Sequence, residues 1–357
     1  MKPKLKIYFL QAKSKILYFK IISFSGIIIF LIFTLFFLTN CSQKILTKPQ
    51  ILSNFNIDNA AFEVLIKENY AYVVNNKGLE IIDISDKKNP KYVSFINTPG
   101  DALAIFLEDN YAFVADNYEG VQIIDISNKE NPKIIQTIPS SEIWDIFIED
   151  DHLYIGGRQG IMQIYDIKDK ENPQALIGFS VYEHIQKIIK KGDYLYSLNF
   201  GHGLSIFKVS NDYKDITALE RIKLPSNSSS FFIKDDYAYV ANTKSGLQII
   251  NISKPESKID LEKPRIISNL NVPTGWVNNI FIYNNYAYLT DGESKVYIVD
   301  ISNKEKPKII NFIDIPNALT NFVYVEDNYC YVTYLMKNKN QTSKENLFNS
   351  GLAIIKL

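Results

Sequence analysis

Four side chains could take part in proton transfer or metal binding: Glu63, Asp145, His184 and His202. Carboxylate and imidazole groups exchange protons near neutral pH, and both bind metal ions. The motifs that would organise such groups are missing, because the sequence has no nucleophile elbow, no paired-histidine motif and no phosphate-binding glycine loop. We therefore predict no catalytic residue, no metal site and no cofactor, and an enzyme built on these groups remains an alternative.

The residues before Cys41 in the sequence indicate that its thiol is a site of lipid attachment. Residues 1–40 carry six Lys and no acidic residue, and residues 21–39 form an uncharged stretch. A basic start followed by an apolar segment is typical of an export signal or a membrane anchor. Leu-Thr-Asn before Cys41 resembles a bacterial lipobox, in which the cysteine is lipidated, except that Asn40 stands where a small residue is usual. We predict a lipoprotein-type export signal, or an uncleaved anchor, over residues 1–40.

Either interpretation places the rest of the chain outside the cytoplasm, tethered to a membrane of a bacterial envelope through residues 41–49. The rest of the chain is acidic on balance and has no clustered basic residues, so we expect no nucleic-acid partner. Two Cys are too few for a disulfide framework or a cysteine zinc cluster.

A repeated pattern fills the chain after the tether. Its clearest copy reads NYAFVAD from residue 110, GVQIIDIS from 120 and NPKII from 131. Each unit reads as four short strands, and the third strand is apolar on both faces. No helical period is present, so neighbouring sheets must cover that strand, as in a β-propeller. One aromatic position recurs in seven units: Tyr70, Tyr111, His152, Tyr194, Tyr237, Tyr286 and Tyr329.

The two ends of this region complement each other. Residues 51–57 match a fourth strand, and residues 351–357 match a third strand whose unit lacks a fourth. Pairing them leaves no open sheet edge. We therefore predict an all-β fold over residues 50–357, a single seven-bladed β-propeller with four antiparallel strands per blade, closed by strand 51–57 against strand 351–357.

The motif Ile-Ile-Asp-Ile-Ser, with its nearby Tyr-Ala-Tyr-Val strand and Asn-Pro turn, resembles the LVIVD-repeat family of bacterial propellers. Lys168 replaces the Ser in one unit, and Lys208 and Lys356 replace the Asp in two others. The resemblance implies an exported propeller and implies no reaction, because the family is largely without assigned chemistry. Copies of the motif or close variants end at Ser85, Ser127, Ser253 and Ser302.

Residues that recur in every unit are expected to be structural. Asp83-Ile-Ser begins like a calcium loop but lacks the Gly at position six and the Glu at position twelve, so we expect it to bond the following turn. The tyrosines of the second strands are expected to pack. His152 occupies a tyrosine position and Cys330 an alanine position, and we expect both to pack as well.

Residues that break the repeat indicate where binding occurs. Aligning the units places one set at the mouth of the central channel: Asp101, Glu142, His184, Asn227 and Trp276. One step inside, the equivalent inner-strand residues are Glu63, Ala104, Asp145, Lys187, Ser230, Asn279 and Phe322. Charges in a dry core would cost several kcal/mol each, so these mixed polar groups suggest a solvated channel.

Two insertions also depart from the period. Residues 334–350 lie between the second and third strands of unit seven, which puts them over the mouth, and a loop of this length is usually disordered or functional. Its apolar residues, Met336 and Phe348 among them, would gain by lying against the mouth near Trp276 or against a partner. Residues 254–263 extend unit five on the opposite face.

The sequence thus predicts a monomeric, envelope-tethered propeller that binds a protein partner or serves as a scaffold. A propeller enzyme, a small-ligand or metal binder at the mouth, and a purely structural surface lipoprotein are the alternatives. The candidate binding residues are Glu63, Asp101, Glu142, Asp145, His184, Lys187, His202, Trp276, Met336 and Phe348.

Replacing Cys41 tests the predicted export signal and lipid attachment. Cys41→Ala should leave an uncleaved precursor that takes up no radiolabelled palmitate, whereas the wild type should be labelled, because the thiol is the attachment point. Equal labelling of the two proteins would contradict a lipid on Cys41.

Overall fold

The computed structural model describes residues 48–181, 183–258, 262–337 and 349–357. Cys41 and Phe348 lie outside the described residues, as do the predicted signal and the middle of both insertions. Residues Pro49–Lys356 form one compact unit, which contains every strand of the described residues. Within the described ranges, no helix is long and apolar enough to cross a membrane.

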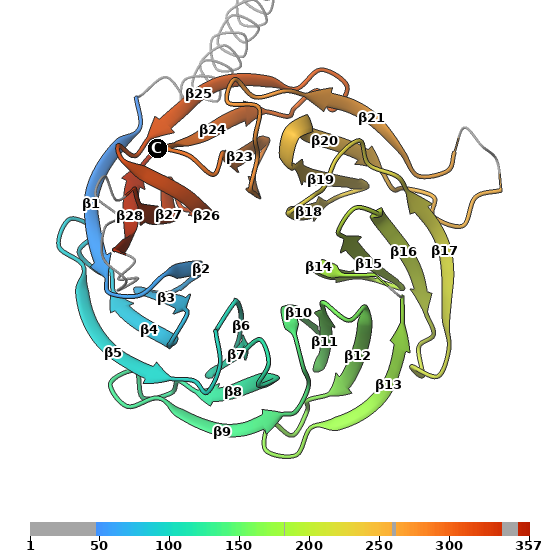
Figure 1. The fold of residues 1–357 in the computed structure, drawn as a ribbon, viewed down its shortest axis with the longest axis horizontal. Coiled ribbons are helices and arrows are strands. Elements are labelled where there is room, and N and C mark those ends of the chain that lie inside the picture. The colour runs from blue at the N-terminus through green and yellow to red at the C-terminus, as the bar shows by residue number, and fades with distance from the viewer. Residues whose placement is uncertain (1–47, 182, 259–261, 338–348) are drawn as a thin grey trace, which may run out of the picture. The chain divides into compact units, whose positions relative to one another are not determined.

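Seven four-stranded antiparallel sheets form a ring around a central channel (Figure 1). Each sheet is one blade, whose strands run from the inner strand beside the channel to the outer strand at the rim. Blade 1 is β2 (Ala61–Lys67), β3 (Tyr70–Asn75), β4 (Gly78–Asp83) and β5 (Lys91–Asn97). Blade 2 is β6 (Ala104–Glu108), β7 (Tyr111–Ala115), β8 (Val121–Asp125) and β9 (Lys133–Ile138). Blade 3 is β10 (Ile143–Glu149), β11 (His152–Gly157), β12 (Ile161–Asp166) and β13 (Gln174–Ser180).

The remaining blades follow the same order. Blade 4 is β14 (Ile185–Lys191), β15 (Tyr194–Asn199), β16 (Gly203–Val209) and β17 (Ile216–Ile222). Blade 5 is β18 (Ser230–Lys234), β19 (Tyr237–Asn242), β20 (Gly246–Asn251) and β21 (Arg265–Leu270), with a 3₁₀ turn, η1 (Thr243–Ser245), before β20. Blade 6 is β22 (Asn279–Tyr283), β23 (Tyr286–Thr290), β24 (Lys295–Asp300) and β25 (Lys308–Asp314). Blade 7 is β26 (Ala318–Glu326), β27 (Tyr329–Met336), β28 (Ser350–Lys356) and β1 (Gln50–Ile57).

Pairing of β1 with β28 closes the ring, which confirms the predicted seven-bladed propeller and its closure. The register of β1 shifts between Ile51 and Ser53, which leaves Leu52 as an extra residue. All six other outer strands carry the same one-residue irregularity against their third strands. The N-terminal strand therefore reproduces an outer strand down to its bulge, although it reaches blade 7 from the other end of the chain.

The hydrophobic core lies between blades. In β3, Tyr72 and Val74 pack with Ile105 and Val114 of blade 2. Val73 points the other way and packs with Ile354 of blade 7. Both faces of the blade are therefore buried against neighbouring blades, as predicted from strands that are apolar on both faces.

Side-chain hydrogen bonds add to this packing at the rim. Ser94 Oγ in β5 donates to the carbonyl of Lys129 in blade 2 at 2.5 Å, and Ser268 Oγ in β21 donates to that of Lys304 in blade 6 at 2.6 Å. Ser53 Oγ in β1 makes the same bond to Lys87 of blade 1 at 2.8 Å. The closing strand thus also joins blade 7 to blade 1.

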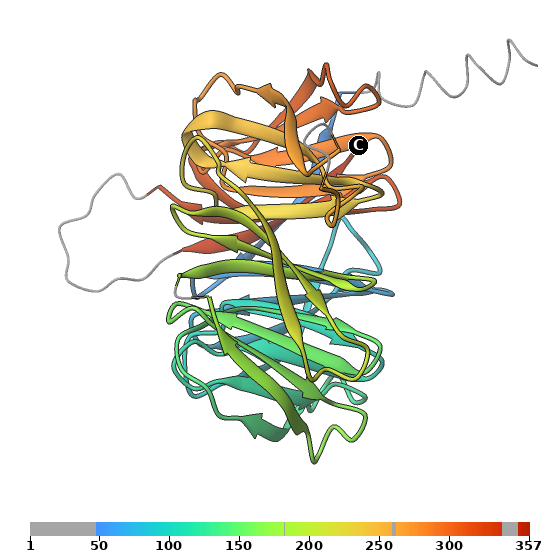
Figure 2. The same ribbon diagram turned by 90° about the vertical axis from the view of Figure 1, so that its right-hand side faces the viewer.

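The connections between strands gather at two faces of the ring (Figure 2). The mouth face carries the loops between second and third strands and those that lead from one blade to the next. The opposite face carries the hairpins between inner and second strands and the turns between third and outer strands. Glu256, in the unit-five insertion, accepts a hydrogen bond from Tyr194 beside the hairpin of blade 4, which places it on the opposite face as predicted.

Removing the closing strand should destabilise the whole ring. A chain that starts at residue 58 lacks β1 and exposes the edge of β28, so its melting temperature should fall by about 10 °C or more, with aggregation. A chain that starts at residue 48 keeps β1 and is the matched control. Equal melting of the two chains by differential scanning calorimetry would show that β1 contributes little to closure.

Candidate functional site

Seven equivalent residues of the inner strands line one cavity of about 240 Å³ at the mouth end of the channel. We call them the channel ring. They occupy the positions that the repeat alignment predicts. The ring consists of Glu63, Ala104, Asp145, Lys187, Ser230, Asn279 and Phe322.

A bulge precedes the ring position in four inner strands. The register shifts immediately before Glu63, Asp145, Lys187 and Phe322, which leaves the preceding residue of each strand unpaired. A bulge twists a strand and redirects its side chains. All four unpaired residues line the same cavity: Phe62, Trp144, Gln186 and Asn321.

The two ring carboxyls are hydrogen-bonded to the next blade. Glu63 Oε2 accepts from the backbone N–H of Ile105 at 3.0 Å, and Asp145 Oδ2 accepts from that of Ile188 at 2.7 Å. Glu63 is 8% exposed and Asp145 is 5% exposed. Both are less solvated than the sequence predicts, because each bond holds its carboxyl against the channel wall.

Burial changes the acidity of these groups. Desolvation raises the pKa of Glu63 to about 7; the nearby Lys187 opposes this, the Asp145 carboxylate adds to it, and the Ile105 N–H opposes it. Desolvation also raises the pKa of Asp145, against Lys187 and the bond from Ile188. Glu63 is thus a carboxyl that changes charge near neutral pH.

Lys187 extends into the channel between these acids. Its Nζ lies 3.8 Å from Asp145 Oδ1, and the same atom lies 5.9 Å from the ring centre of Phe322 in blade 7. Burial alone would lower the pKa of Lys187, but the carboxylates of Asp145 and Glu63 outweigh it and raise the pKa. No described residue lies close enough to accept a hydrogen bond from Lys187 Nζ.

Below the ring the channel is apolar. A second cavity of about 180 Å³ shares Glu63, Asp145, Lys187 and Phe322 with the first and continues inward. In six of the seven inner strands, the residue two positions further along lines this cavity, because side chains on one face of a strand recur every second residue. We call this part the shaft, and its walls include Leu65, Phe106, Phe147, Ile189, Phe232 and Phe281.

The histidines do not join the ring. The carbonyl of His184 accepts from the Phe200 N–H at 2.9 Å, and His202 Nδ1 lies 2.9 Å from the Phe200 carbonyl. Both histidines are exposed on mouth-face loops of blade 4, and neither lines the two channel cavities. In the described part of the chain, no group of three or more His, Cys, Asp and Glu side chains is arranged to hold a metal ion.

Asp101 and Glu142 also lie on mouth-face loops outside the two channel cavities. The Glu142 carbonyl accepts from the N–H of Arg158 at 2.8 Å, the same bond that His184 makes with Phe200. This equivalence supports the alignment that placed Glu142 and His184 in one position. It also shows that the position is held by its backbone, which leaves the side chain free to vary.

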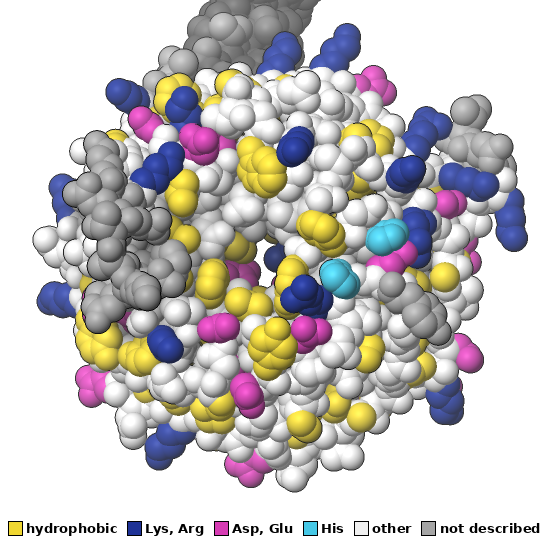
Figure 3. All heavy atoms as spheres, viewed as in Figure 1, with side chains coloured by type: hydrophobic (Ala, Val, Ile, Leu, Met, Phe, Trp, Pro, Cys, Tyr) yellow, Lys and Arg dark blue, Asp and Glu magenta, His cyan; other side chains and the backbone are white. Residues whose placement is uncertain are grey.

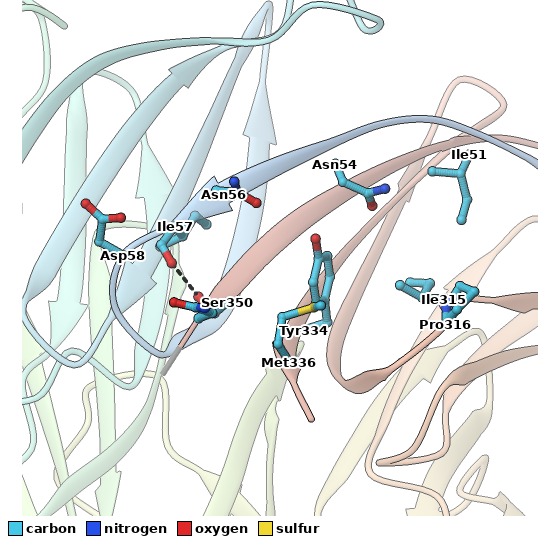
Figure 4. Close-up of a pocket in the computed structure, with 11 residues that line it drawn as sticks. Ile51, Asn54, Asn56, Ile57, Asp58, Ile315, Pro316, Tyr334, Met336 and Ser350 are labelled. Carbon is cyan, nitrogen blue, oxygen red and sulfur yellow. Dashed lines mark hydrogen bonds between the residues drawn. The ribbon is translucent and has the colours of Figure 1, made fainter. Parts of the chain in front are cut away.

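Met336 lies in a separate groove (Figure 4). The expected loop begins later than predicted, because β27 continues to Met336 and β28 starts at Ser350. Met336 borders a groove of about 430 Å³ with Tyr334, Ile315 and Pro316, and Trp276 is not among its residues. The longer hairpin carries Met336 to the junction of blades 6 and 7, and this groove does not bring it together with Trp276. Contact with a partner, the other role expected of this loop, stays a prediction.

The recurring residues have the structural roles predicted for them. Asp83 Oδ1 accepts from the Ser85 N–H at 2.8 Å, and Asp125 and Asp300 make the same bond to the serines that follow them. Lysines of the next turns cover the first tyrosines of neighbouring blades, with Lys87 Nζ 4.9 Å from the ring centre of Tyr329. His152 stacks on Tyr213 at 4.2 Å, and Cys330 is fully buried.

Comparison with known protein families identifies the repeat. The LVIVD repeat is found four times, at residues 60–98, 99–138, 226–260 and 274–314. The chain is a seven-bladed propeller that contains four LVIVD repeats. The four matches fall on blades 1, 2, 5 and 6, and the other three blades are those in which Lys168, Lys208 or Lys356 departs from the motif.

Solved structures similar to the LVIVD propeller share its fold. The computationally designed Ika8 protein has a TM-score of 0.59 and 11% identity, and the match covers 86% of this chain and all of that one. The structure of U3-55K has a TM-score of 0.67 and 9% identity, over 87% of this chain and 98% of that one. No curated protein shows significant sequence similarity.

Three exposed apolar side chains of the propeller were not expected from the sequence. Tyr118, Ile161 and Phe200 are 59%, 43% and 46% exposed at the mouth face. Tyr118 and Phe200 stand in the short connections between second and third strands, where other blades carry polar residues. An aromatic residue in a turn that is polar in the other blades indicates an exposed apolar side chain, and this pattern is visible in the sequence.

Titration of Glu63 should be visible in the stability of the propeller. Its pKa is about 7 in the folded protein and about 4.5 otherwise, so the folded state holds an extra proton in that window and stability falls as the pH rises through it. Glu63→Gln keeps an acceptor oxygen and removes this loss. Its stability relative to the wild type should therefore grow by up to about 3 kcal/mol between pH 4.5 and pH 8, measured by urea denaturation.

A stability difference that stays constant with pH would contradict this assignment. Glu80, whose pKa is also raised to about 7 by burial and by Asp58, contributes equally to both proteins and cancels in the comparison.

Proposed function

We propose that this LVIVD propeller is an envelope-tethered interaction module that binds a protein partner through its mouth face. The observation that carries the proposal is the distribution of exposed apolar side chains. Five of the nine large ones lie at the mouth face: Tyr118, Ile161, Phe200, Trp276 and Met336. The other four, on outer strands, are Tyr92, Leu176, Ile310 and Phe312.

The opposite face provides the contrast. Its described hairpins and turns contribute none of the nine exposed large apolar residues, although they are as numerous as the connections of the mouth face. Apolar side chains gather around the channel opening on the mouth face (Figure 3). Aromatic residues and Met that surround an opening and are mixed with charges have the composition of protein-binding surfaces.

The sequence supports export of this module and its attachment to a membrane. A basic start, the apolar residues 21–39 and Cys41 favour export and lipid attachment, and a short tether would keep a monomeric propeller near the membrane. A partner in the same membrane or on its surface would then be held at high effective concentration.

Site-specific crosslinking in cells tests which face binds. A photoreactive phenylalanine analogue at Phe200 or at Trp276 should give the same discrete adduct, because both side chains would be covered by the partner. Matched positions on exposed hairpins of the opposite face, Asn110 and Asp193, should give none. Phe200→Ser should reduce the adduct formed at position 276 about tenfold, as expected for an apolar contact at the centre of an interface.

Two results would contradict the proposal. Adducts from Asn110 or Asp193 alone would move the interface to the opposite face. Absence of any adduct from the mouth positions, with the protein present at normal levels, would indicate that this face binds no protein.

A further inference from the structure

We infer that the axial channel binds a primary ammonium compound with a short apolar tail, its ammonium group beside Glu63 in the channel ring and its tail in the shaft. This goes beyond the proposed function, since the ligand would occupy the channel and leave the apolar residues of the mouth face free. The two channel cavities share Glu63, Asp145, Lys187 and Phe322, so polar head and apolar tail would lie in continuous space.

The fold does not require charged side chains in the channel ring to link one blade to the next. Glu63 and Asp145 each accept a backbone N–H from the next blade, but Asn279 Oδ1 accepts the N–H of Val323 in the same way at 3.4 Å. A neutral amide therefore suffices for that role. A buried carboxylate is costly compared with an amide, so its charge needs another explanation.

The charges are also unevenly distributed around the ring. Glu63, Asp145 and Lys187 lie in blades 1, 3 and 4, whereas blades 5 and 6 contribute Ser230 and Asn279, which are hydrogen-bonded to each other at 3.1 Å. Lys187 is the one cation of the ring and lies 3.8 Å from Asp145. Glu63 is left without an ion-pair partner within 4 Å among the described residues, so the ring lacks one positive charge.

A primary ammonium group supplies that charge in a suitable form. It carries three N–H donors, and Glu63 together with the amide and hydroxyl oxygens of the ring offers acceptors around it. A carboxylate ligand would meet two acids and a single lysine that already faces one of them. A metal ion would require more acidic or imidazole ligands than the described residues bring together here.

The shaft determines the rest of the ligand. Its walls are Phe, Ile and Leu side chains, with Phe106 and Phe147 edge to face at 5.5 Å and Phe232 and Phe281 at 5.3 Å. Nothing on these walls would pair with a polar tail, whereas a short alkyl or aryl chain would lose water-exposed apolar surface.

The same geometry predicts a pH dependence. The titratable groups that face Glu63 are Lys187 and Asp145, and burial raises the pKa of Glu63 to about 7. A bound ammonium group favours ionised Glu63, so binding should weaken about tenfold per pH unit below this value and level off above it.

Binding of hexylammonium to the full chain in lipid nanodiscs tests the inference. Trp144 lines the upper cavity, so its fluorescence in a Trp276→Phe background reports occupancy. At pH 8, hexylammonium should bind saturably, and 1-hexanol and hexanoate at least tenfold more weakly. Glu63→Gln should reduce hexylammonium binding to the level of hexanol, while Glu171→Gln, in an exposed turn of the opposite face, should leave it unchanged.

Three results would overturn the inference: equal binding of hexanol, tighter binding of hexanoate, or no saturable binding of hexylammonium in the millimolar range. Because Glu63→Gln retains the acceptor for Ile105, a melting temperature at least as high as that of the wild type would show that a loss of binding is not a loss of folding. Failure of this test would leave the crosslinking test of the mouth face untouched.

Discussion

Hydrogen bonds and packing that pass from each blade to the next hold the ring together, since strand pairing alone stabilises only single blades. At the rim, serines of outer strands donate to carbonyls of the neighbouring turn, and at the channel Glu63, Asp145 and Asn279 accept backbone N–H groups of the next inner strand. A ring of such contacts is complete only if the last blade meets the first. Pairing of β1 with β28 achieves this, and Ser53 of the same strand then reaches blade 1.

This dependence limits where function can reside. The tyrosines of the second strands, the Asp-Ile-Ser turns and the lysines that cover the next tyrosine all have structural partners, so changing them would disturb a blade interface. The mouth-face loops are held by their backbones. In the channel ring, an amide accepts the N–H of the next blade as a carboxylate does, so the charge of the side chain can differ from blade to blade. Both proposals draw on these two groups of residues.

The fold could be predicted almost completely from the sequence because repetition multiplies a weak signal. A single Ile-Ile-Asp-Ile-Ser segment is ambiguous, but seven units that agree in strand, turn and aromatic positions determine the blades, and the unmatched ends determine the closure. The identity of the ring residues followed from the same alignment. Their environment did not, because the hydrogen bonds of Glu63 and Asp145 go to neighbouring blades and depend on bulges that no sequence pattern marked.

The extended hairpin of blade 7 is a second feature that the sequence pattern did not predict. The first three residues of the expected loop, 334–336, are strand instead: Leu335 pairs with Ser350 and Met336 with Ala318, and Met336 lines a groove with Ile315 and Pro316. Gly351 makes this possible: a Cβ there would lie 2.4 Å from the Tyr334 hydroxyl, so only glycine lets that ring cross the strand. In blades 1, 2, 4 and 5 the equivalent glycine has positive φ and ends the hairpin.

The channel and the mouth face are coupled by their positions. The upper cavity opens at the mouth, and the five exposed apolar residues lie on the same face, in loops or at strand ends. A protein seated on them would cover the cavity, so it would either trap a ligand already in the channel or exclude one still outside. Linkage then requires that ligand and partner change each other's affinity by the same factor. Glu63, which changes charge near neutral pH, would make that mutual effect depend on the acidity of the compartment.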